Sequence, residues 1–112
     1  DNTDPTAAHI VLYIEGTPVG TCRFFPGQEE GEYVIGRIAI LKKYRGGGLG
    51  SEVLAAAESA IRDAGGQKAI LHAQQQARPF YEKQSYTAYG EPDLDEDCPH
   101  IWMKKIFPSS SH

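Results

Sequence analysis

The sequence YVIGRIAILKKYRGGGLG, residues 33–50, decides the fold, because it joins an apolar run to a cluster of glycines. Residues 33–41 are apolar at nearly every position, which predicts a strand that is buried on both faces. Gly36 inside this run indicates a β-bulge or a close approach of another group to the backbone. Residues 49–64 then place apolar side chains at helical spacing. The glycine cluster therefore connects a buried strand to the start of a helix.

Shorter apolar runs on both sides extend this centre into a mixed sheet. Two of them precede it and are separated by Gly16-Thr17-Pro18, which predicts a hairpin. The helix stops at Gly65-Gly66 and another strand follows, so the strands on either side of the helix form a parallel βαβ unit. The expected order is β-β-β-α-β-α-β-β, a mixed α/β fold. The outer strands are expected at residues 10–15, 19–25, 69–73, 86–89 and 100–107, and a second helix at 77–83.

The composition is that of one globular domain over residues 1–112. The 112 residues are 40% hydrophobic and 23% charged, with a formal net charge of −4. This acidic balance argues against a nucleic-acid partner, and no apolar run reaches the roughly 18 residues that span a membrane. The N-terminal residues do not have the pattern of a signal peptide, so we expect a cytoplasmic location and free thiols at Cys22 and Cys98.

The segment Arg45-Gly46-Gly47-Gly48-Leu49-Gly50 has the features of a phosphate-binding loop. A helix start presents unpaired N–H groups and the positive end of the helix dipole, and glycines lack the Cβ atoms that would keep a phosphate away. A Walker A loop is excluded, because Ser51-Glu52 follows Gly50 without the required lysine. A dinucleotide-binding loop is disfavoured, because Ser51 stands in place of the third glycine. A strand-to-helix connection without a ligand is the alternative.

Two motifs resemble those of the GNAT N-acetyltransferase superfamily. Arg45, Gly48 and Gly50 match its Arg/Gln-x-x-Gly-x-Gly/Ala pattern, and residues 77–83, A-x-x-F-Y-E-K, match a second signature in the expected order. Ser85 stands where the family has a glycine. The segment DEDCPHIWM, residues 95–103, is similar to that of a subgroup of small microbial and fungal members. The resemblance extends over residues 10–107.

This resemblance implies a mixed, mostly antiparallel, splayed sheet with a central βαβ unit and helices packed on it. It also implies an enzyme that moves an acetyl group from acetyl-coenzyme A to a primary amine by direct attack. Gln74 would hydrogen-bond the coenzyme in place of the usual asparagine, and the strand around Ala39 would pair with the pantetheine arm. The implied coenzyme A site comprises Ile38, Ala39, Ile40, Arg45, Gly46, Gly47, Gly48, Leu49, Gly50, Gln74 and Tyr81.

The resemblance also assigns catalytic roles. Tyr81 matches the family tyrosine that protonates the departing thiolate, and a phenol with a pKa of about 10 is protonated at neutral pH. An aromatic side chain packed under the sheet is the alternative for Tyr81. The amine must lose a proton, and we take His100 as the base because histidine titrates near neutrality and this one begins the last strand. A structural hydrogen bond explains His100 equally well.

Three other candidates for the base are His72, Glu32 and the acidic residues 91–97. His72 lies inside a predicted strand, where packing on the sheet accounts for it, and Glu32 is a further candidate. The acidic residues 91–97 either attract a cationic amine or form a solvated loop. No neighbour in sequence lowers the pKa of Cys98, which excludes it as a nucleophile, and the four histidines are too scattered for a metal site.

Two further functions compete with acetylation of a small amine. One is a non-catalytic module that binds or senses coenzyme A, and the other is an enzyme that acetylates proteins. The expected partner is a small-molecule or peptide amine, not a nucleic acid or a membrane, and the sequence leaves open whether the chain forms a homodimer. Family members usually begin with a further strand and one or two helices that help to line the acceptor pocket. These elements are either reduced in this chain or lost before Asp1.

Overall fold

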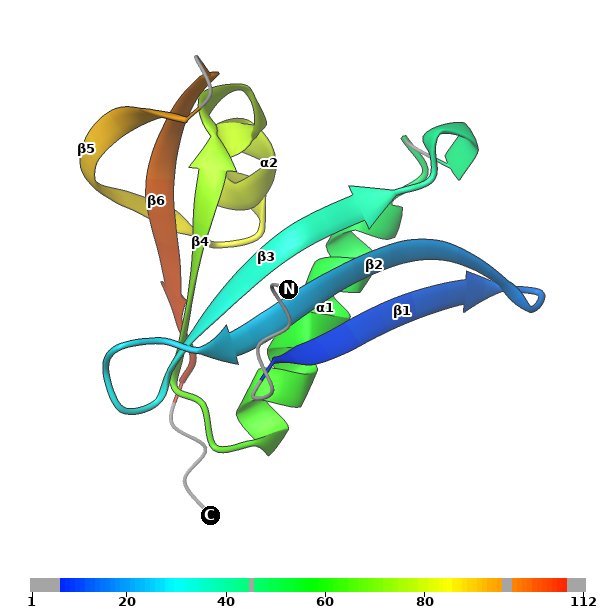
Figure 1. Cartoon of the computed structure of the whole chain (residues 1–112), viewed down its shortest axis with the longest axis horizontal. Helices are drawn as coiled ribbons and strands as arrows, with labels where there is room; N and C mark the ends of the chain where they lie inside the picture. The colour runs from blue at the N-terminus through cyan, green and yellow to red at the C-terminus, as the bar shows by residue number, and fades with distance from the viewer. Residues whose placement is uncertain (1–6, 45, 96–97, 109–112) are drawn as a thin grey trace.

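The computed structural model describes residues 7–44, 46–95 and 98–108, and it contains the predicted order of elements (Figure 1). Within these residues, six strands form one mixed sheet in the order β1-β2-β3-β4-β6-β5. Two short 3₁₀ turns, η1 and η2, precede the two helices. The elements are β1 (Ala8–Ile14), β2 (Thr17–Pro26), β3 (Glu32–Ile40), η1 (Lys42–Tyr44), α1 (Leu49–Asp63), β4 (Lys68–Gln74), η2 (Gln75–Ala77), α2 (Arg78–Lys83), β5 (Thr87–Asp95) and β6 (Cys98–Ile106).

The predicted antiparallel pairs at the two ends of the sheet are confirmed. β1 pairs with β2 and β5 pairs with β6, both antiparallel. The first hairpin turns at Glu15 and Gly16, whose φ angles are 49° and 81°, as a two-residue type I′ turn requires. Thr17 and Pro18, which we expected in this turn, are instead the first two residues of β2.

The βαβ unit joins β3 to β4 in parallel, as predicted, but the two strands pair over only three positions. Glu32 lies opposite Lys68, and Val34 lies opposite Ile70 at the last pair. Beyond this point the strands diverge, and Figure 1 shows β3 and β4 separating toward their carboxyl ends. We call this region, residues 35–40 of β3 and 71–74 of β4, the fork. It is the splay that the family resemblance implies.

A bulge in β3 accompanies the fork. Thr21 of β2 pairs with Ala39, whereas Arg23 pairs with Gly36, so two steps along β2 correspond to three along β3. The extra residue bends a strand and increases its twist, which is consistent with β3 turning away from β4. The bulge expected from Gly36 is therefore confirmed. A close approach is not found there, because a Cβ at Gly36 would meet no atom within 4 Å.

The core lies between one face of the sheet and the two helices. Figure 1 shows α1 crossing behind β1, β2 and β3. The inward side chains alternate along each strand, as the two-residue period of a strand requires. Together with α1 they form one buried cluster: Cys22, Phe24, Ile35, Val53, Leu54, Ala57, Ile61, Ala69, Leu71, Ala73, Tyr86, Ile101, Met103 and Phe107.

The prediction that β3 is buried on both faces is wrong. Ile35 is buried against α1, but Ala39 is exposed and Val34 is only half-buried. The physical reason is that neither described helix covers the other face of the sheet. The apolar run thus reflects one packed face and one face that is open over the described residues.

The C-terminal end of α1 is fixed by backbone contacts, and polar contacts hold the middle of the helix. Gly65 has a φ of 90°, and the N–H of Gly66 donates to the carbonyl of Ile61 at 2.8 Å, which confirms the predicted stop. Glu58, whose side chain is 13% exposed, accepts hydrogen bonds from the Tyr86 hydroxyl at 2.8 Å and from Lys105 Nζ at 2.9 Å. Among the described residues, neither helix is long and apolar enough to cross a membrane.

Gly20 tests how closely α1 packs on the sheet. A Cβ at this position would lie 2.7 Å from Ile40 Cδ1 and 2.9 Å from Val53 Cγ2, whereas a Cβ at Gly36 would meet nothing. We expect Gly20→Ala to lower the free energy of unfolding by about 1–3 kcal/mol, because added atoms in a packed core force side chains out of place. Gly36→Ala is the matched control and should unfold as the wild type does. Urea unfolding of both variants measures the difference, and equal midpoints would contradict the packing described here.

Candidate functional site

The glycine loop between η1 and α1 has a backbone that requires glycine. Gly46 and Gly48 have φ angles of 87° and 84°, values that side-chain-bearing residues rarely adopt. Gly48 is the N-cap of α1. A Cβ at either position would meet no atom within 4 Å, so the loop is open to an approaching group. Arg45 lies outside the described residues.

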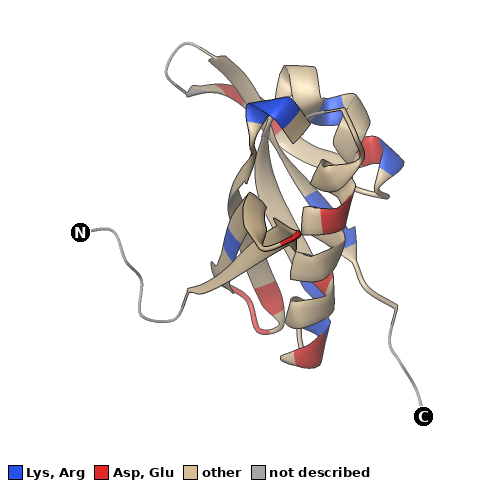
Figure 2. Ribbon diagram, turned by 90° about the vertical axis from the view of Figure 1, so that its right-hand side faces the viewer, with Lys and Arg blue, Asp and Glu red and all other residues tan. Residues whose placement is uncertain are grey.

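The first turn of α1 presents unpaired N–H groups. No side chain caps this helix start, and within the described part of the chain no acceptor is bonded to the N–H groups of Leu49, Gly50 or Ser51. These N–H groups and the helix dipole favour a negative charge at this position. Lys42 and Lys43 of η1 are exposed next to the loop, and Figure 2 views the molecule from this side.

The fork opens beside this loop, at the carboxyl end of β3. Ile38 and Ile40 pack partly against the core, and Ala39 is exposed. Gln74 is exposed at the end of β4, where its Oε1 accepts a hydrogen bond of 2.8 Å from Gln76 Nε2. The described residues expected to contact the coenzyme, Tyr81 apart, thus lie on the two arms of the fork, in the adjacent loop or in the first turn of α1.

Tyr81 on α2 lies on the helix-covered face of the sheet. Its ring packs edge-to-face on Phe80 and Tyr86, with centroids 5.0 and 6.1 Å away. Burial raises the pKa of the Tyr81 phenol above its ordinary value, and the nearby Cys22 thiol adds to the rise. Burial also raises the pKa of Cys22 to about 11. Tyr81 therefore keeps its proton at neutral pH, as a proton donor must.

Contacts between the helices bring Tyr81 close to the glycine loop. A Cβ at Gly50 would lie 3.4 Å from the Phe80 ring, so α2 packs against the first turn of α1. Cys22, whose thiol helps to raise the pKa of Tyr81, lies between Thr21 and Arg23, the two β2 residues that flank the bulge. Tyr81 is thus placed near the bulge at one side and near the glycine loop at the other. The packing expected as the alternative for Tyr81 is found, and its role as a proton donor stays a prediction.

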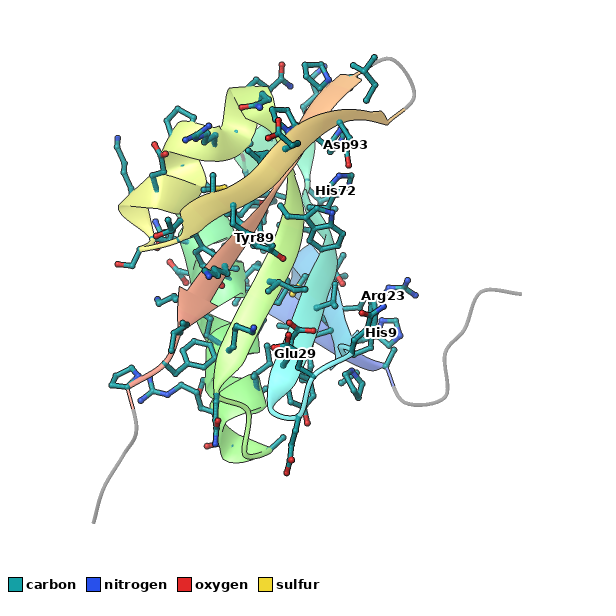
Figure 3. The ribbon with its side chains drawn as sticks, turned by 90° about the vertical axis from the view of Figure 1, so that its left-hand side faces the viewer. His9, Arg23, Glu29, His72, Tyr89 and Asp93 are labelled. Carbon is teal, nitrogen blue, oxygen red and sulfur yellow. The ribbon has the colours of Figure 1, made fainter. Side chains whose placement is uncertain are left out.

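The opposite face of the sheet carries a polar and aromatic cluster next to the fork. His72 lies opposite Trp102, and Asp93 lies opposite His100, so the strand registers place all four on one face. His72 Nε2 is 2.9 Å from Asp93 Oδ1, and Figure 3 shows the two side chains together. The His72 ring stacks on His100 at 4.7 Å and on Trp102 at 4.8 Å between centroids. We call these four residues the His72 cluster.

Comparison with known proteins identifies the family. The family model for the "Acetyltransferase (GNAT) family" matches residues 1–86. The chain belongs to the GNAT family of acetyltransferases. An uncharacterised N-acetyltransferase of Bacillus subtilis, YjcF, is 38% identical over 106 residues, which cover 94% of this chain and 74% of that protein. The match with this chain covers 65% and 70% of the lengths of two other Bacillus subtilis relatives.

Solved structures have the same fold. An acyl-CoA N-acyltransferase from Pseudomonas aeruginosa is 28% identical with a TM-score of 0.77, over 89% of this chain and 68% of that one. An aminoglycoside 6′-N-acetyltransferase solved with coenzyme A has a TM-score of 0.81 over 96% of this chain and 77% of that one. Its identity is 18%, so this likeness concerns the fold alone. The GNAT fold predicted from the two motifs is therefore confirmed.

The candidate bases have different hydrogen-bond partners in the structure. Nδ1 of His100 donates to the backbone carbonyl of Cys98 at 2.9 Å, which is the structural bond that competed with a catalytic role. His72 lies on the sheet face as expected, and it also bonds a carboxylate. The interpretation of residues 91–97 as a solvated loop is wrong for the described residues, because 91–95 belong to β5. Glu96 and Asp97 lie outside the described residues.

Glu32 is occupied by a structural role and does not suit catalysis. One carboxylate oxygen accepts N–H bonds from Gln28 at 3.0 Å and Glu29 at 3.4 Å, and the other is 3.3 Å from Lys68 Nζ. Burial alone would raise the pKa of Glu32, but the hydrogen bonds from Lys68, Gln28 and Glu29 outweigh it and lower the pKa. The side chain therefore closes the loop between β2 and β3 as a carboxylate.

Two residues of the open face, Trp102 and Arg23, were not singled out from the sequence, and Asp93 was considered only as part of the acidic run 91–97. Trp102 and Asp93 complete the His72 cluster, and Arg23 lies on the same face with its guanidinium 5.3 Å from the Phe25 ring. Nε of Arg23 is buried and has no hydrogen-bond partner among the described residues. Alternation along the strands assigns such residues to a face, but only the register between strands shows that they meet. Figure 3 labels Arg23, His72 and Asp93 on this side.

The role of Glu32 predicts a pH dependence of stability. Its pKa is lowered in the folded state, so its contribution is complete above the unfolded value of about 4.3 and is lost as the pH falls through the folded value. Hydrogen bonds to a charged group contribute about 1.5–3 kcal/mol, and Glu32→Gln should lose part of this at pH 7. Urea unfolding should show that the free energy of unfolding of Glu32→Gln is below that of the wild type at pH 7, and that this difference is smaller at pH 3. Exposed Glu30→Gln is the control, and a deficit of equal size at both pH values would contradict the assignment.

Proposed function

We propose that this chain transfers an acetyl group from acetyl-coenzyme A to a primary amine by direct attack, within one GNAT domain of residues 1–112. The observation that carries the proposal is the coincidence of three features at one end of β3. These are the open glycine loop at the start of α1, the fork between β3 and β4, and a partly buried Tyr81 whose pKa is raised. The acceptor that we propose is the amine of a small molecule or a peptide.

The residues around the loop and fork suit coenzyme A. The backbone N–H groups of residues 46–51 would bind its pyrophosphate, with the charges of Lys42 and Lys43 beside them. The pantetheine arm carries amides, and the part of β3 that has lost β4 as a partner offers a strand edge to which such a group can bond. Gln74 adds a side-chain amide on the other arm. A coenzyme-A complex of a protein with this fold supports the same choice of ligand.

The reaction that we propose needs one proton donor and one proton acceptor. The amine nitrogen forms a bond to the thioester carbonyl carbon, and the carbon–sulfur bond breaks. The departing sulfur takes the proton of the Tyr81 hydroxyl, whose raised pKa keeps that proton available at neutral pH. The amine gives up its extra proton to a base. No acyl-enzyme is formed, so no nucleophilic side chain is required.

Tyr81→Phe tests the proposed reaction. Release of free thiol from acetyl-coenzyme A is measured with spermidine, glucosamine and a dipeptide as acceptors. We expect the variant to lower kcat by ~100-fold or more, because that is the usual contribution of a proton donor, and to leave coenzyme A affinity unchanged. Exposed Tyr13→Phe is the control. Tight coenzyme A binding by the wild type without turnover of any amine would instead support a non-catalytic coenzyme A module.

The anion site can be tested separately with an isosteric pair at Gly47. This residue is exposed, and an added Cβ would come no closer than 3.6 Å to the carbonyl of Tyr44. Gly47→Asp places a negative charge beside the proposed pyrophosphate site, whereas Gly47→Asn has the same shape without the charge. We expect calorimetry to show at least ~10-fold weaker coenzyme A binding for Gly47→Asp than for Gly47→Asn. The difference in affinity should decrease as added salt screens the charges. Equal affinities at low salt would place the pyrophosphate elsewhere.

A further inference from the structure

We propose that His72 accepts the proton of the acceptor amine and that Asp93 is the residue that positions it. This inference rests on the proposed acetyl transfer and names the base that the reaction needs. It is carried by the 2.9 Å contact between His72 Nε2 and Asp93 Oδ1, and by the two rings that enclose the imidazole.

The contact with Asp93 fixes which nitrogen of His72 is the base. A carboxylate only accepts hydrogen bonds, so Nε2 of His72 carries the proton that Asp93 receives. Nδ1 then has a free lone pair, and among the described residues no donor is bonded to it. When Nδ1 takes a proton, the imidazolium is stabilised by the adjacent carboxylate, as in other histidine–aspartate pairs.

The packing holds the imidazole in place and leaves it accessible. His100 and Trp102 stack on the ring with interplanar angles of 26° and 29°. The His72 side chain is 27% exposed and that of Asp93 is 50% exposed, so a small amine can reach this face. The titratable groups in contact with His72 are Asp93 from β5 and His100 from β6.

The position of His72 on β4 places the base at the fork. Ile70 is the last β4 residue that pairs with β3, and His72 is the next residue of β4 that points to the same open face. Leu71 and Ala73 point into the core, on the side where Tyr81 packs. Base and acid thus lie on opposite faces of the sheet, next to the fork. An amine can lose its proton on one face while the thiolate gains one on the other.

His100 is the weaker candidate for the base, although we expected it from the sequence. Its ring bonds a neutral backbone carbonyl, whereas His72 bonds a carboxylate. A carboxylate stabilises the charge that forms on the ring, and a carbonyl does so less. His100 also pairs with Gln74, two residues beyond His72 along β4. We therefore assign it to the wall of the site, where it holds the His72 ring by stacking.

His72→Gln is the decisive variant, with His100→Gln as the competing one and His9→Gln as the control. His9 is exposed on β1, away from the cluster. With the amine acceptor that the wild type uses fastest among spermidine, glucosamine and a dipeptide, we expect His72→Gln to lower kcat at pH 7 by ~100-fold or more. The deficit should shrink at high pH, where more of the amine is already unprotonated, and coenzyme A affinity should not change. His100→Gln should have a smaller effect with an unchanged pH profile.

Nitrogen-15 NMR of the histidine rings tests the role of Asp93. We expect the wild type to show His72 as the Nε2–H tautomer, and Asp93→Asn to reduce that tautomer and to lower kcat more than it changes KM. Turnover by His72→Gln equal to wild type, or loss of the pH dependence in His100→Gln instead, would overturn the assignment. A wild type that binds coenzyme A but acetylates no amine would refute the proposed function, and the assignment would fail with it.

Discussion

The early end of pairing between β3 and β4 is the constraint on which the rest of the structure depends. Parallel neighbours in the middle of a sheet normally continue to bond, because buried backbone N–H and carbonyl groups need partners. Here pairing stops after Val34 and Ile70, at the point where the bulge bends β3. An open edge of this kind is usually a liability at the rim of a sheet. In the centre of a sheet it is the place where, in our proposal, the amide groups of the pantetheine arm bind.

The order of elements along the chain places the starts of α1 and α2 next to this opening. β3 and β4 are parallel, so their carboxyl ends lie toward the same side of the molecule, and both connections that leave them begin there. α1 follows β3 and presents its uncapped start, while α2 follows β4 and carries Tyr81. The contact between Phe80 and Gly50 holds the two helix starts together. One topological feature thus explains why the anion site and the proton donor that we propose are neighbours.

The sequence predicted those parts of the molecule that depend on local pattern. The order of elements, the βαβ unit, the bulge at Gly36 and the helix stop at Gly65 all follow from nearby residues. The His72 cluster could not be predicted, because it depends on how β4, β5 and β6 align. A shift of register between Tyr89 and Asp93 decides that Asp93 lies opposite His100. The acidic run suggested a loop because charges favour solvent, but an edge strand such as β5 also exposes its side chains.

The sheet itself separates the two proton-transfer groups that we propose. On the helix-covered face, apolar packing around Tyr81 penalises the phenolate and so keeps the proton on the hydroxyl. On the open face, His72 donates a hydrogen bond to the carboxylate of Asp93. The two groups that we propose therefore lie in different surroundings, one apolar and one polar. A phenol and an imidazole in direct contact would hydrogen-bond each other, whereas a sheet that opens at a fork leaves each free for its own step.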